Sequence, residues 1–420
     1  MKQYEAYKDS GIQWLGEIPS HWAALKLKHV CAITDGTHFS PATKSEGRIY
    51  ITVSNVYDNK IHLENALRIS EEDFQNLVRQ GCQPKVGDVL LAKDGTVGRS
   101  AIVVDNDFVA LSSLGILSPG KQITSSYLKY CLDSLFLQEQ MNAAMAGSAL
   151  RRITISKICE FIGLLPPLAE QEVIAAYLDQ KVGKIDAILS EKEAMVEQLQ
   201  QYRKSLISET VTRGLDPNVP MKDSGIDWIG QIPQHWSMVR LKYVSSLQSG
   251  SNLTSEQIEG TGEYPVFGGN GLRGYYHEYN TEGDRVLIGR QGALCGNINF
   301  ASGKFWATEH AVVCHPIKQY NVIWLGSLLE IMNLNQYSIA SAQPGLSVDR
   351  IKQLEIPLPP FEEQEKIGSL IEKKDSELKQ TISELQSQIE DFKAYKSSVI
   401  TEAVTGKVDL RDWKLGEVTA

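Results

Sequence analysis

The 420-residue sequence lacks most of the signatures that would give it a chemistry of its own. It contains no Gly-x-x-x-x-Gly-Lys-Ser/Thr phosphate loop, so we expect no ATP binding of that kind. No apolar run approaches the roughly 20 residues that a membrane span requires, and residues 1–5 do not resemble a signal peptide. Six scattered cysteines without a Cys-x-x-Cys pair are typical of reduced thiols. These absences predict a cytoplasmic protein with no cofactor, no metal and no membrane contact.

A strong excess of basic charge is also missing, because the net charge is −9. By segment, residues 1–165 are neutral, residues 166–221 carry −3, residues 222–358 carry −2 and residues 359–420 carry −4. Near-neutral segments can still present a local basic face, but they do not bind DNA tightly through phosphates alone.

Catalytic motifs are incomplete. Residues 267–271, Phe-Gly-Gly-Asn-Gly, fit the Phe-x-Gly-x-Gly pattern of S-adenosylmethionine binding, but the partner motif Asn/Asp-Pro-Pro-Tyr/Phe is missing. The nearest string, 358–361, has Leu358 in place of the amide or acid. Residues 372–374, Glu-Lys-Lys, resemble part of a nuclease motif but fit a solvated helix face better. His21 and His235 each precede a Trp, where a structural hydrogen bond is the better explanation. A DNA methyltransferase is therefore disfavoured.

Two long helices are predicted by a repeat with an offset of 193 residues. Residues 166–172, Pro-Pro-Leu-Ala-Glu-Gln-Glu, return as residues 359–365, Pro-Pro-Phe-Glu-Glu-Gln-Glu, and the offset holds as far as Val211-Thr212 and Val404-Thr405. Prolines before each helix and acidic residues in its first turn are typical of helix starts. About 40 residues at 1.5 Å each predict rods of roughly 60 Å.

The apolar residues of these helices recur with the 3.5-residue period of a coiled coil. The two seams are Leu178, Val182, Ile185, Leu189, Val196 and Leu199, and Leu378, Ile382, Leu385, Ile389 and Phe392. Lys192 interrupts the first seam where Leu385 stands in the second, so the two faces are not interchangeable. Packing of the two helices on each other is the simplest arrangement; separate coiled coils with other chains are the alternative.

A second repeat divides the chain into two halves. Residues 8–22 return as residues 222–236 with the pattern Lys-Asp-Ser-Gly-Ile-x-Trp-x-Gly-x-Ile-Pro-x-His-Trp, at an offset of 214 residues. Each half is thus a globular domain followed by a long helix. We predict domains at 1–165 and 222–358, a helix and linker at 166–221, and a helix and tail at 359–420.

The two globular domains have similar frames and different loops. Runs at 48–53, 88–92 and 285–288 are typical of strands. Residues 89–95 align with 286–292, and 108–110 with 305–307, whereas residues 35–39 and 265–276 find no counterpart. Divergent loops on one frame are expected if each domain recognises something different.

On these motifs the chain resembles the specificity subunits of type I restriction–modification systems. The resemblance covers essentially the whole length and depends on residues 8–22 and 222–236, on Pro-Leu-Pro-Pro-x-x-Glu-Gln at 357–364 and on residues 401–407. The first copy departs at Leu164-Leu165 and Arg213-Gly214.

The resemblance implies an α+β fold in which two mixed α/β target recognition domains are separated by two long antiparallel helices. It also implies a non-catalytic subunit whose domains each read half of a bipartite double-stranded DNA site. The helices would separate the domains and dock two modification (methyltransferase) subunits, with restriction (endonuclease and translocase) subunits added outside. A purely structural coiled-coil adaptor is the rival outside DNA recognition.

Candidate DNA-reading residues are polar side chains beside glycines, because Arg and Lys match guanine and Asn and Gln match adenine in the major groove. We predict DNA contacts for Thr37, His38, Lys93, Thr96, Arg99, Arg151 and Arg152 in the first domain, and for Asn270, Arg273, Tyr275, Tyr276, Arg290 and Gln291 in the second. Arg151 and Arg152 fit phosphate contacts. Lys93 and Arg290 share one position of the frame, from which each is expected to project into a groove; we favour phosphate for Lys93 and a base for Arg290.

Overall fold

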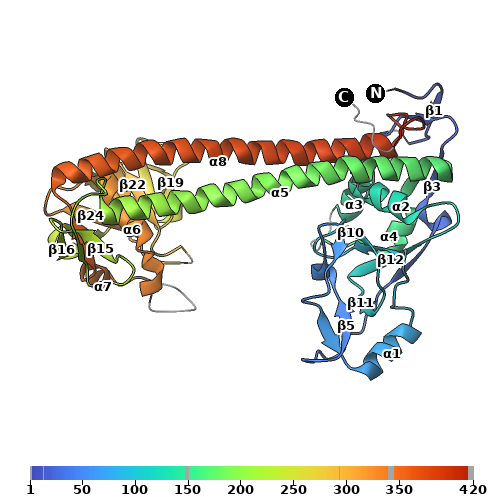
Figure 1. The fold of residues 1–420 in the computed structure, drawn as a ribbon, viewed down its shortest axis with the longest axis horizontal. Helices are drawn as coiled ribbons and strands as arrows, with labels where there is room; N and C mark the ends of the chain where they lie inside the picture. Colours follow the sequence, from blue (N-terminus) through green and yellow to red (C-terminus); the bar gives the residue numbers. More distant parts are fainter. Residues whose placement is uncertain (1, 13, 147–150, 293, 339–344, 415–420) are drawn as a thin grey trace. The chain divides into compact units, whose positions relative to one another are not determined.

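A computed structural model of the chain describes residues 2–12, 14–146, 151–292, 294–338 and 345–414. The chain divides into two compact units: unit 1 is Met1–Lys192 with Ser387–Ala420, and unit 2 is Glu193–Gln386. Unit 2 is continuous in sequence, whereas unit 1 combines both ends of the chain. The boundary between the units crosses both long helices, so each unit contains part of each helix (Figure 1).

The described residues of unit 1 form two larger sheets and three two-stranded sheets. Its strands are β1 (Tyr7–Asp9), β2 (Glu17–Pro19), β3 (Ala23–Lys26), β4 (Cys31–Asp35), β5 (Arg48–Ile51), β6 (Val56–Tyr57), β7 (Lys60–Ile61), β8 (Leu67–Ile69), β9 (Val89–Ala92), β10 (Ser100–Ile102), β11 (Phe108–Ala110), β12 (Leu114–Pro119) and β13 (Ile162–Leu165). One sheet has the order β10-β9-β12-β4 and is antiparallel. The other has the order β11-β5-β8, in which β11 and β5 are parallel.

Four short helices complete unit 1: α1 (Glu71–Arg79), α2 (Ser125–Asp133), α3 (Leu135–Met145) and α4 (Ile155–Glu160). Polar N-caps start the first three of them. Ser70 accepts a hydrogen bond from the amide of Asp73, Thr124 from Tyr127 and Ser134 from Leu137, so each cap satisfies a backbone donor that the helix leaves free.

Unit 2 repeats this plan. Its strands are β14 (Met221–Asp223), β15 (Gln231–Pro233), β16 (Ser237–Arg240), β17 (Ser245–Ser249), β18 (Tyr264–Gly268), β19 (Gly271–Tyr276), β20 (Thr281–Glu282), β21 (Arg285–Gly289), β22 (Ile298–Ala301), β23 (Lys304–Ala307), β24 (Ala311–Pro316) and β25 (Glu355–Leu358), and its short helices are α6 (Val322–Ile331) and α7 (Val348–Lys352). The sheet β17-β24-β21-β22 matches β4-β12-β9-β10, and the parallel pair β18 and β23 matches β5 and β11. The internal repeat predicted from sequence is therefore a structural repeat.

The long helices are α5 (Leu168–Arg213) and α8 (Phe361–Val404), and they run antiparallel. As residue numbers rise along α5, those of its partners in α8 fall: Asp186 pairs with Lys396 in unit 1, and Arg203 pairs with Asp375 in unit 2. The predicted packing of the two helices on each other is confirmed in each unit.

The predicted seam residues face the helix–helix contact. Leu178, Val182, Ile185, Leu189, Ile382, Leu385 and Ile389 are buried, and Val196, Leu199, Leu378 and Phe392 are half-buried. Lys192, the interruption of the first seam, donates a 2.6 Å hydrogen bond to Gln388 and lies 5.7 Å from the centre of the Phe392 ring. Its ammonium group therefore has an amide oxygen and an aromatic face as partners within the helix pair.

The two repeated motifs of the sequence meet in a glutamate clamp. In unit 1, Glu170 in the first turn of α5 accepts hydrogen bonds from Tyr4 and from the indole of Trp22 (3.1 Å), and it contacts His21 at 2.8 Å. In unit 2, Glu363 in the first turn of α8 accepts from the indole of Trp236 (3.0 Å) and contacts His235 at 2.9 Å. The His-Trp pair therefore anchors the start of each long helix, which confirms the structural role predicted for His21 and His235.

The glutamine after each clamp glutamate connects the start of the long helix to the start of a short helix. The amide oxygen of Gln171 accepts from the backbone amide of Thr124, which is the N-cap of α2, at 3.0 Å. Gln364 accepts in the same way from Asn321, the N-cap of α6, at 3.1 Å. Both glutamines are almost fully buried, so each Glu-Gln dipeptide joins elements of the fold.

Candidate nucleic-acid interface

Lys93 and Arg290 occupy the same position of the repeated frame. Lys93 follows β9; its amide donates to the carbonyl of Ser113 at 2.9 Å, and its carbonyl accepts from the amide of Ile153 at 2.8 Å. Arg290 follows β21 and makes the same two backbone hydrogen bonds, with His310 and Leu346, both at 2.9 Å. The alignment of 89–95 with 286–292 that the sequence suggested is confirmed by this backbone pairing.

A glycine turn beside this position exists in both units. A Cβ atom on Gly36 would lie 2.3 Å from the carbonyl oxygens of Ala110 and Leu111, and one on Gly250 would lie 2.0 Å from the carbonyl oxygen of Ala307. Only glycine lets the two chain segments approach this closely. The segment at 35–39 therefore has a counterpart in unit 2, beginning at Ser249, and the expectation that it has none is wrong; the similarity lies in backbone path more than in side chains.

Lys93 and Arg290, each directly after a strand, are called the strand-end cations below. In unit 1 this residue, Lys93, is buried and paired with an acid. Only 4% of the Lys93 side chain is exposed, and its Nζ lies 3.6 Å from Oδ1 of Asp35, the last residue of β4. The other oxygen of Asp35 is 3.0 Å from Nε2 of His38, whose side chain is 73% exposed. The expectation that Lys93 projects into a groove is wrong, because its ammonium group turns inward to Asp35. His38 is the exposed member of this cluster.

Arg151 and Arg152 are both exposed at the same edge of unit 1. Arg152 forms a two-pronged ion pair with Asp94, at 2.7 and 2.9 Å, and these hydrogen bonds raise the pKa of its guanidinium group. The carbonyl of Arg151 accepts from the amide of Gly95. Asp94 thus holds the segment against the β9 loop and leaves the Arg151 side chain toward solvent.

The remaining residues of unit 1 that were predicted to contact DNA lie in different surroundings. Thr37 is 3% exposed, and its hydroxyl closes a turn with the backbone of Phe39, so it shapes the loop from inside. Thr96 is exposed in the loop after β9. Arg99 is also exposed, but it lines a cavity of about 440 Å³ with Asp133 and Lys396, beside α8. The structure does not bring Arg99 together with His38.

In unit 2 the strand-end cation is held by a neutral group. Nη1 of Arg290 donates to the hydroxyl of Ser249 at 3.3 Å, and Ser249 ends β17 just as Asp35 ends β4. Gln291 beside it is exposed. Asn270 is exposed and accepts from the side chain of Asn297 at 2.8 Å. Arg290, Gln291, Asn270 and Asn297 belong to one group, because the loop at 268–271 packs on Gly289.

Arg273, Tyr275 and Tyr276 form a separate group along β19. Arg273 donates to the hydroxyl of Ser255 at 3.2 Å, and Tyr275 exchanges two backbone hydrogen bonds with Glu259. The Tyr276 ring packs edge-on against Trp306, with 5.2 Å between ring centres. The Arg273 side chain and the Tyr275 backbone therefore bind the segment at 255–259, whereas the Tyr276 ring packs on Trp306 of β23.

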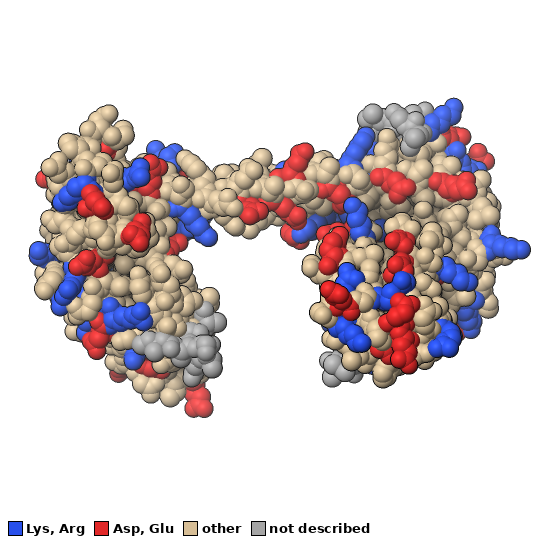
Figure 2. Space-filling view, turned by 60° about the horizontal axis from the view of Figure 1, so that its bottom comes forward, with Lys and Arg blue, Asp and Glu red and all other residues tan. Residues whose placement is uncertain are grey.

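The neighbours that decide the charge of each cluster were missed from the sequence. Asp35 and Ser249 end equivalent strands, and Asn297 and His310 contact the second cluster. Asp35 lies in the segment at 35–39, but its pairing with Lys93 was not expected. The match of Asp35-Gly36 with Ser249-Gly250 would have been the signal. Acidic and basic side chains are interspersed on both units in the view of Figure 2, so neither surface drawn there is uniformly basic.

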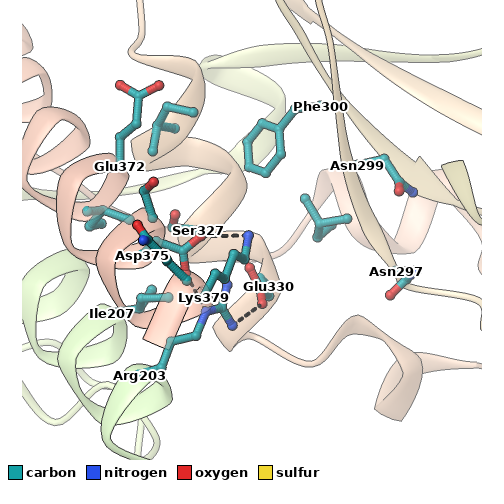
Figure 3. Close-up of a pocket in the computed structure, with 15 residues that line it drawn as sticks. Arg203, Ile207, Asn297, Asn299, Phe300, Ser327, Glu330, Glu372, Asp375 and Lys379 are labelled. Carbon is teal, nitrogen blue, oxygen red and sulfur yellow. Dashed lines mark hydrogen bonds and ion pairs between the residues drawn. The ribbon is translucent and has the colours of Figure 1, made fainter. Parts of the chain in front are cut away.

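A second cavity lies in unit 2, beside the long helices (Figure 3). It measures about 920 Å³ and is bordered by Arg203 of α5, Glu330 of α6 and Asp375 of α8. Arg203 pairs with both acids, which leaves no net positive charge for an anion. Burial opposes ionisation of Asp375, but hydrogen bonds from Arg203 and Lys379 outweigh it and lower the pKa of that carboxyl group.

Groups suited to metal binding are not assembled in the residues that the structure describes. Within them, no three His, Cys, Asp or Glu side chains are placed to hold a metal ion. All six cysteines are free, and burial raises the pKa of Cys31, Cys131 and Cys314 to about 12, so these thiols are neutral near pH 7. The described helices include none with the length and apolarity of a membrane span.

The same fold occurs in a solved structure from work on complex assembly and conformational transition of the type I R-M system. That structure has a TM-score of 0.67 and 18% sequence identity, and the match covers 93% of this chain and 99% of the other. The two repeated units on a pair of long helices are therefore an established architecture.

The family model of the type I restriction modification DNA specificity domain matches residues 19–198 and 233–390, and the chain belongs to this family. The specificity subunit of the type I restriction enzyme EcoprrI of Escherichia coli is 40% identical over 163 residues, which are 38% of this chain and 40% of that subunit. The EcoKI specificity subunit of the same species is 21% identical, with 85% of this chain and 82% of that subunit covered. The putative MjaX specificity subunit of Methanocaldococcus jannaschii is 22% identical, with 94% and 96% covered. DNA sequence recognition is thus the family role, and the resemblance seen in the sequence is confirmed.

Proposed function

We propose that this chain is the specificity subunit of a type I restriction–modification complex and reads a bipartite site on double-stranded DNA. Each unit recognises one half of the site. The observation that carries the proposal is the shared strand-end frame with different side chains: Lys93 with Asp35 in unit 1, and Arg290 with Ser249 in unit 2. The same backbone frame with different side chains suits two different half-sites that are read in the same manner.

In unit 2, the group of Arg290, Gln291, Asn270 and Asn297 is proposed to contact the bases. The guanidinium group of Arg290 has five donors and a neutral partner, so it can offer two of them to O6 and N7 of guanine. Gln291 and Asn270 carry the paired donor and acceptor that match adenine. Arg273, Tyr275 and Tyr276 are proposed to contact DNA along the β19 edge of the same unit.

In unit 1, His38 is the proposed base reader, and the exposed Thr96 on the loop after β9 is proposed to contact DNA as well. Arg151 and Arg152 are proposed to contact phosphates, because they are exposed and close to this loop. Arg99 is assigned to phosphate as well, from the cavity beside α8. Lys93 and Thr37 act indirectly, by fixing the loop that carries His38.

The long helices are proposed to set the spacing of the half-sites and to dock two modification subunits, with restriction subunits added outside. The chain itself is proposed to be non-catalytic and to take no cofactor. In support, the methyltransferase motif is broken at Leu358, and Glu170 and Glu363 are engaged in the structural clamps.

The test is methylation of host DNA mapped with and without this chain, combined with methylation assays on the isolated chain and on the chain with its modification partner. We expect a two-part methylated sequence that appears only when chain and partner are both present. Methyl transfer by the isolated chain would support the methyltransferase alternative. Partner binding without any sequence dependence would support a structural adaptor.

A further inference from the structure

The turn between β23 and β24 lies among the loops of unit 2 that are proposed to contact bases. The carbonyl of His310 in this turn accepts from the amide of Arg290 at 2.9 Å, and a Cβ atom on Gly269 would lie 3.1 Å from the same oxygen. The ends of β17 and β21 lie at this edge as well, because both strands are antiparallel to β24. His310 therefore lies between the loops that carry Arg290 and Asn270.

The side chain of His310 is exposed and has a carboxylate partner. It is 41% exposed, and its Nε2 lies 3.1 Å from Oε1 of Glu309. The other carboxylate oxygen, Oε2, is buried and has no hydrogen-bond partner among the residues that the structure describes. A buried carboxylate oxygen without a donor costs free energy. Folding stability therefore gives no reason for a glutamate at this position, whereas the contact with His310 does.

The equivalent turn of unit 1 contains two serines. Ser112 and Ser113 occupy the positions of Glu309 and His310, because the carbonyl of Ser113 accepts from the amide of Lys93 at 2.9 Å. Both serines are 8% exposed. Between the two turns, the exposed histidine is therefore a feature of unit 2.

An exposed histidine with a carboxylate partner nevertheless occurs at the strand ends of both units. In unit 1 it is His38, which is 73% exposed and whose Nε2 lies 3.0 Å from Asp35. In unit 2 it is His310, and the same ring nitrogen faces Glu309. The two units thus present the same pair of groups from different loops, which extends the likeness between their recognition edges.

The carboxylate determines which hydrogen bonds the His310 ring can offer. A carboxylate accepts hydrogen bonds, so Nε2 carries a proton, and in the neutral ring Nδ1 is then an acceptor. The donors that bases present in the major groove are the amino groups at N4 of cytosine and N6 of adenine. Arg290 offers only donors, which suit guanine. His310 therefore adds a complementary acceptor beside Arg290.

We propose that His310 reads the amino group of a cytosine or an adenine in the half-site of unit 2, and that Glu309 is a positioning residue that orients the His310 ring; this deepens, and rests on, the proposed function. The acceptor on His310 and the donors on Arg290 select bases of opposite hydrogen-bonding character. His310 thus specifies a base pair in addition to those assigned to Arg290, Gln291 and Asn270.

The experiment measures binding of the full-length chain, in complex with its modification subunits, to the mapped cognate site and to its single-base variants. His310→Ala is expected to bind the cognate site about 10-fold more weakly and to lose discrimination at one base pair only. Glu309→Ala is expected to reduce discrimination at that same pair by about 3-fold, because the ring loses its orientation. Glu309→Gln retains an acceptor and is expected to restore most of the discrimination.

Base analogues identify the group that His310 contacts. The pyrimidinone analogue of cytosine and unsubstituted purine in place of adenine each lack only the amino group. Removal of the amino group at the affected base pair is expected to weaken binding of the wild-type complex about 10-fold and to leave binding of His310→Ala unchanged, since the two changes remove the same contact. Whichever analogue has this effect distinguishes cytosine from adenine.

His277→Ala is the matched control, because His277 is 69% exposed and lies 3.9 Å from Glu278 in the same unit. It is expected to keep discrimination at every base pair. Thermal melting checks that the variants are folded, and His310→Phe, which keeps an aromatic ring without nitrogen atoms, repeats the test if His310→Ala is unfolded.

Equal loss on all DNAs in the His310 variants, or no loss on any, would overturn the assignment of His310 and leave the DNA-recognition proposal standing. The same base-specific loss in His277→Ala would also overturn it. Unchanged discrimination in Glu309→Ala would remove the positioning role of Glu309. A wild-type complex without any sequence preference would overturn the proposed function together with this inference.

Discussion

Unit 1 and unit 2 place a basic residue at the same point of the same frame and treat it in opposite ways. In unit 1 the carboxylate of Asp35 draws Lys93 inward and neutralises it, whereas in unit 2 the hydroxyl of Ser249 holds Arg290 without cancelling its charge. A single side chain at the end of β4 or β17, two strands away in the sheet, therefore decides whether the strand-end cation has a carboxylate or a hydroxyl as its partner. Backbone equivalence between repeats does not imply equivalent surroundings for the side chains.

The two glutamate clamps also differ, in burial and in the number of their partners. Glu170 is 6% exposed and has three partners, Tyr4, His21 and Trp22. Glu363 is 24% exposed and has two, because residue 218, the counterpart of Tyr4, is an asparagine without this contact. The ends of the chain add to unit 1: Lys2 pairs with Asp412 at 2.9 Å, and Tyr7 donates to the carbonyl of Gly406.

The largest effect on DNA binding is expected from lengthening the two helices between the units while leaving each unit intact. A four-residue insertion in both helices, at Glu193 and Gln386, adds about 6 Å to each rod. Both residues lie at the boundary between the units. We expect the gap between half-sites to lengthen by about two base pairs with both half-sites unchanged, and the original site to bind at least about 30-fold more weakly. Methylation mapping measures the gap; an unchanged gap in an active complex would contradict the role of the helices.

The largest effect on folding stability is expected at the two clamps. Glu170→Ala leaves two buried donors, Tyr4 and Trp22, without an acceptor and removes the partner of the partly exposed His21, so it is expected to lower the free energy of unfolding by about 3–5 kcal/mol. Glu363→Ala is expected to cost only about 1–3 kcal/mol, because water reaches its site. Urea unfolding of the full chain measures both. Equal losses would show that the greater burial and the Tyr4 contact of the first clamp have no energetic consequence.

A smaller effect, confined to DNA binding, is expected at the strand ends. Arg290→Ala in the complex with modification subunits is expected to cost about 1–3 kcal/mol at one base pair of the site. Lys93→Ala is expected to lower stability and to spare discrimination between bases. Binding to the cognate site, to single-base variants and to random DNA separates these outcomes, with Lys318→Ala as an exposed basic control. Equal loss on all three DNAs would move Arg290 to the phosphate class.

The smallest effect tests the residue that distinguishes the units. Ser249→Asp gives Arg290 the partner that Lys93 has, and we expect it to weaken the unit 2 half-site by about 1 kcal/mol or more, since an ion pair must then be broken on binding. Ser249→Ala removes the hydroxyl without adding charge and is the matched control. An unaltered affinity for Ser249→Asp would show that the charge of Arg290 is not used in recognition.

Much of the architecture could be predicted from the sequence, because it depends on local patterns and on sequence repeats. The 3.5-residue period, prolines and acidic first turns specify α5 and α8, and apolar runs specify β5, β9 and β21. Two offsets in one chain establish the internal repeat. The shared position of Lys93 and Arg290 could also be found, because the strands before them align directly. The candidate list remains a set of predictions for DNA contact.

Only the tertiary structure decided which side chains that are distant in sequence contact each other. The sequence contains both the His-Trp motif and the Glu-Gln motif, yet about 150 residues separate His21 from Glu170, and only folding joins them in a clamp. The inward turn of Lys93 depends on Asp35, which lies on a strand 58 residues earlier in the chain. Local pattern determines elements, because backbone hydrogen bonding and apolar periodicity act over a few residues. Side-chain electrostatics is determined by neighbours in space, and these are set by the packing of strands that lie far apart in sequence.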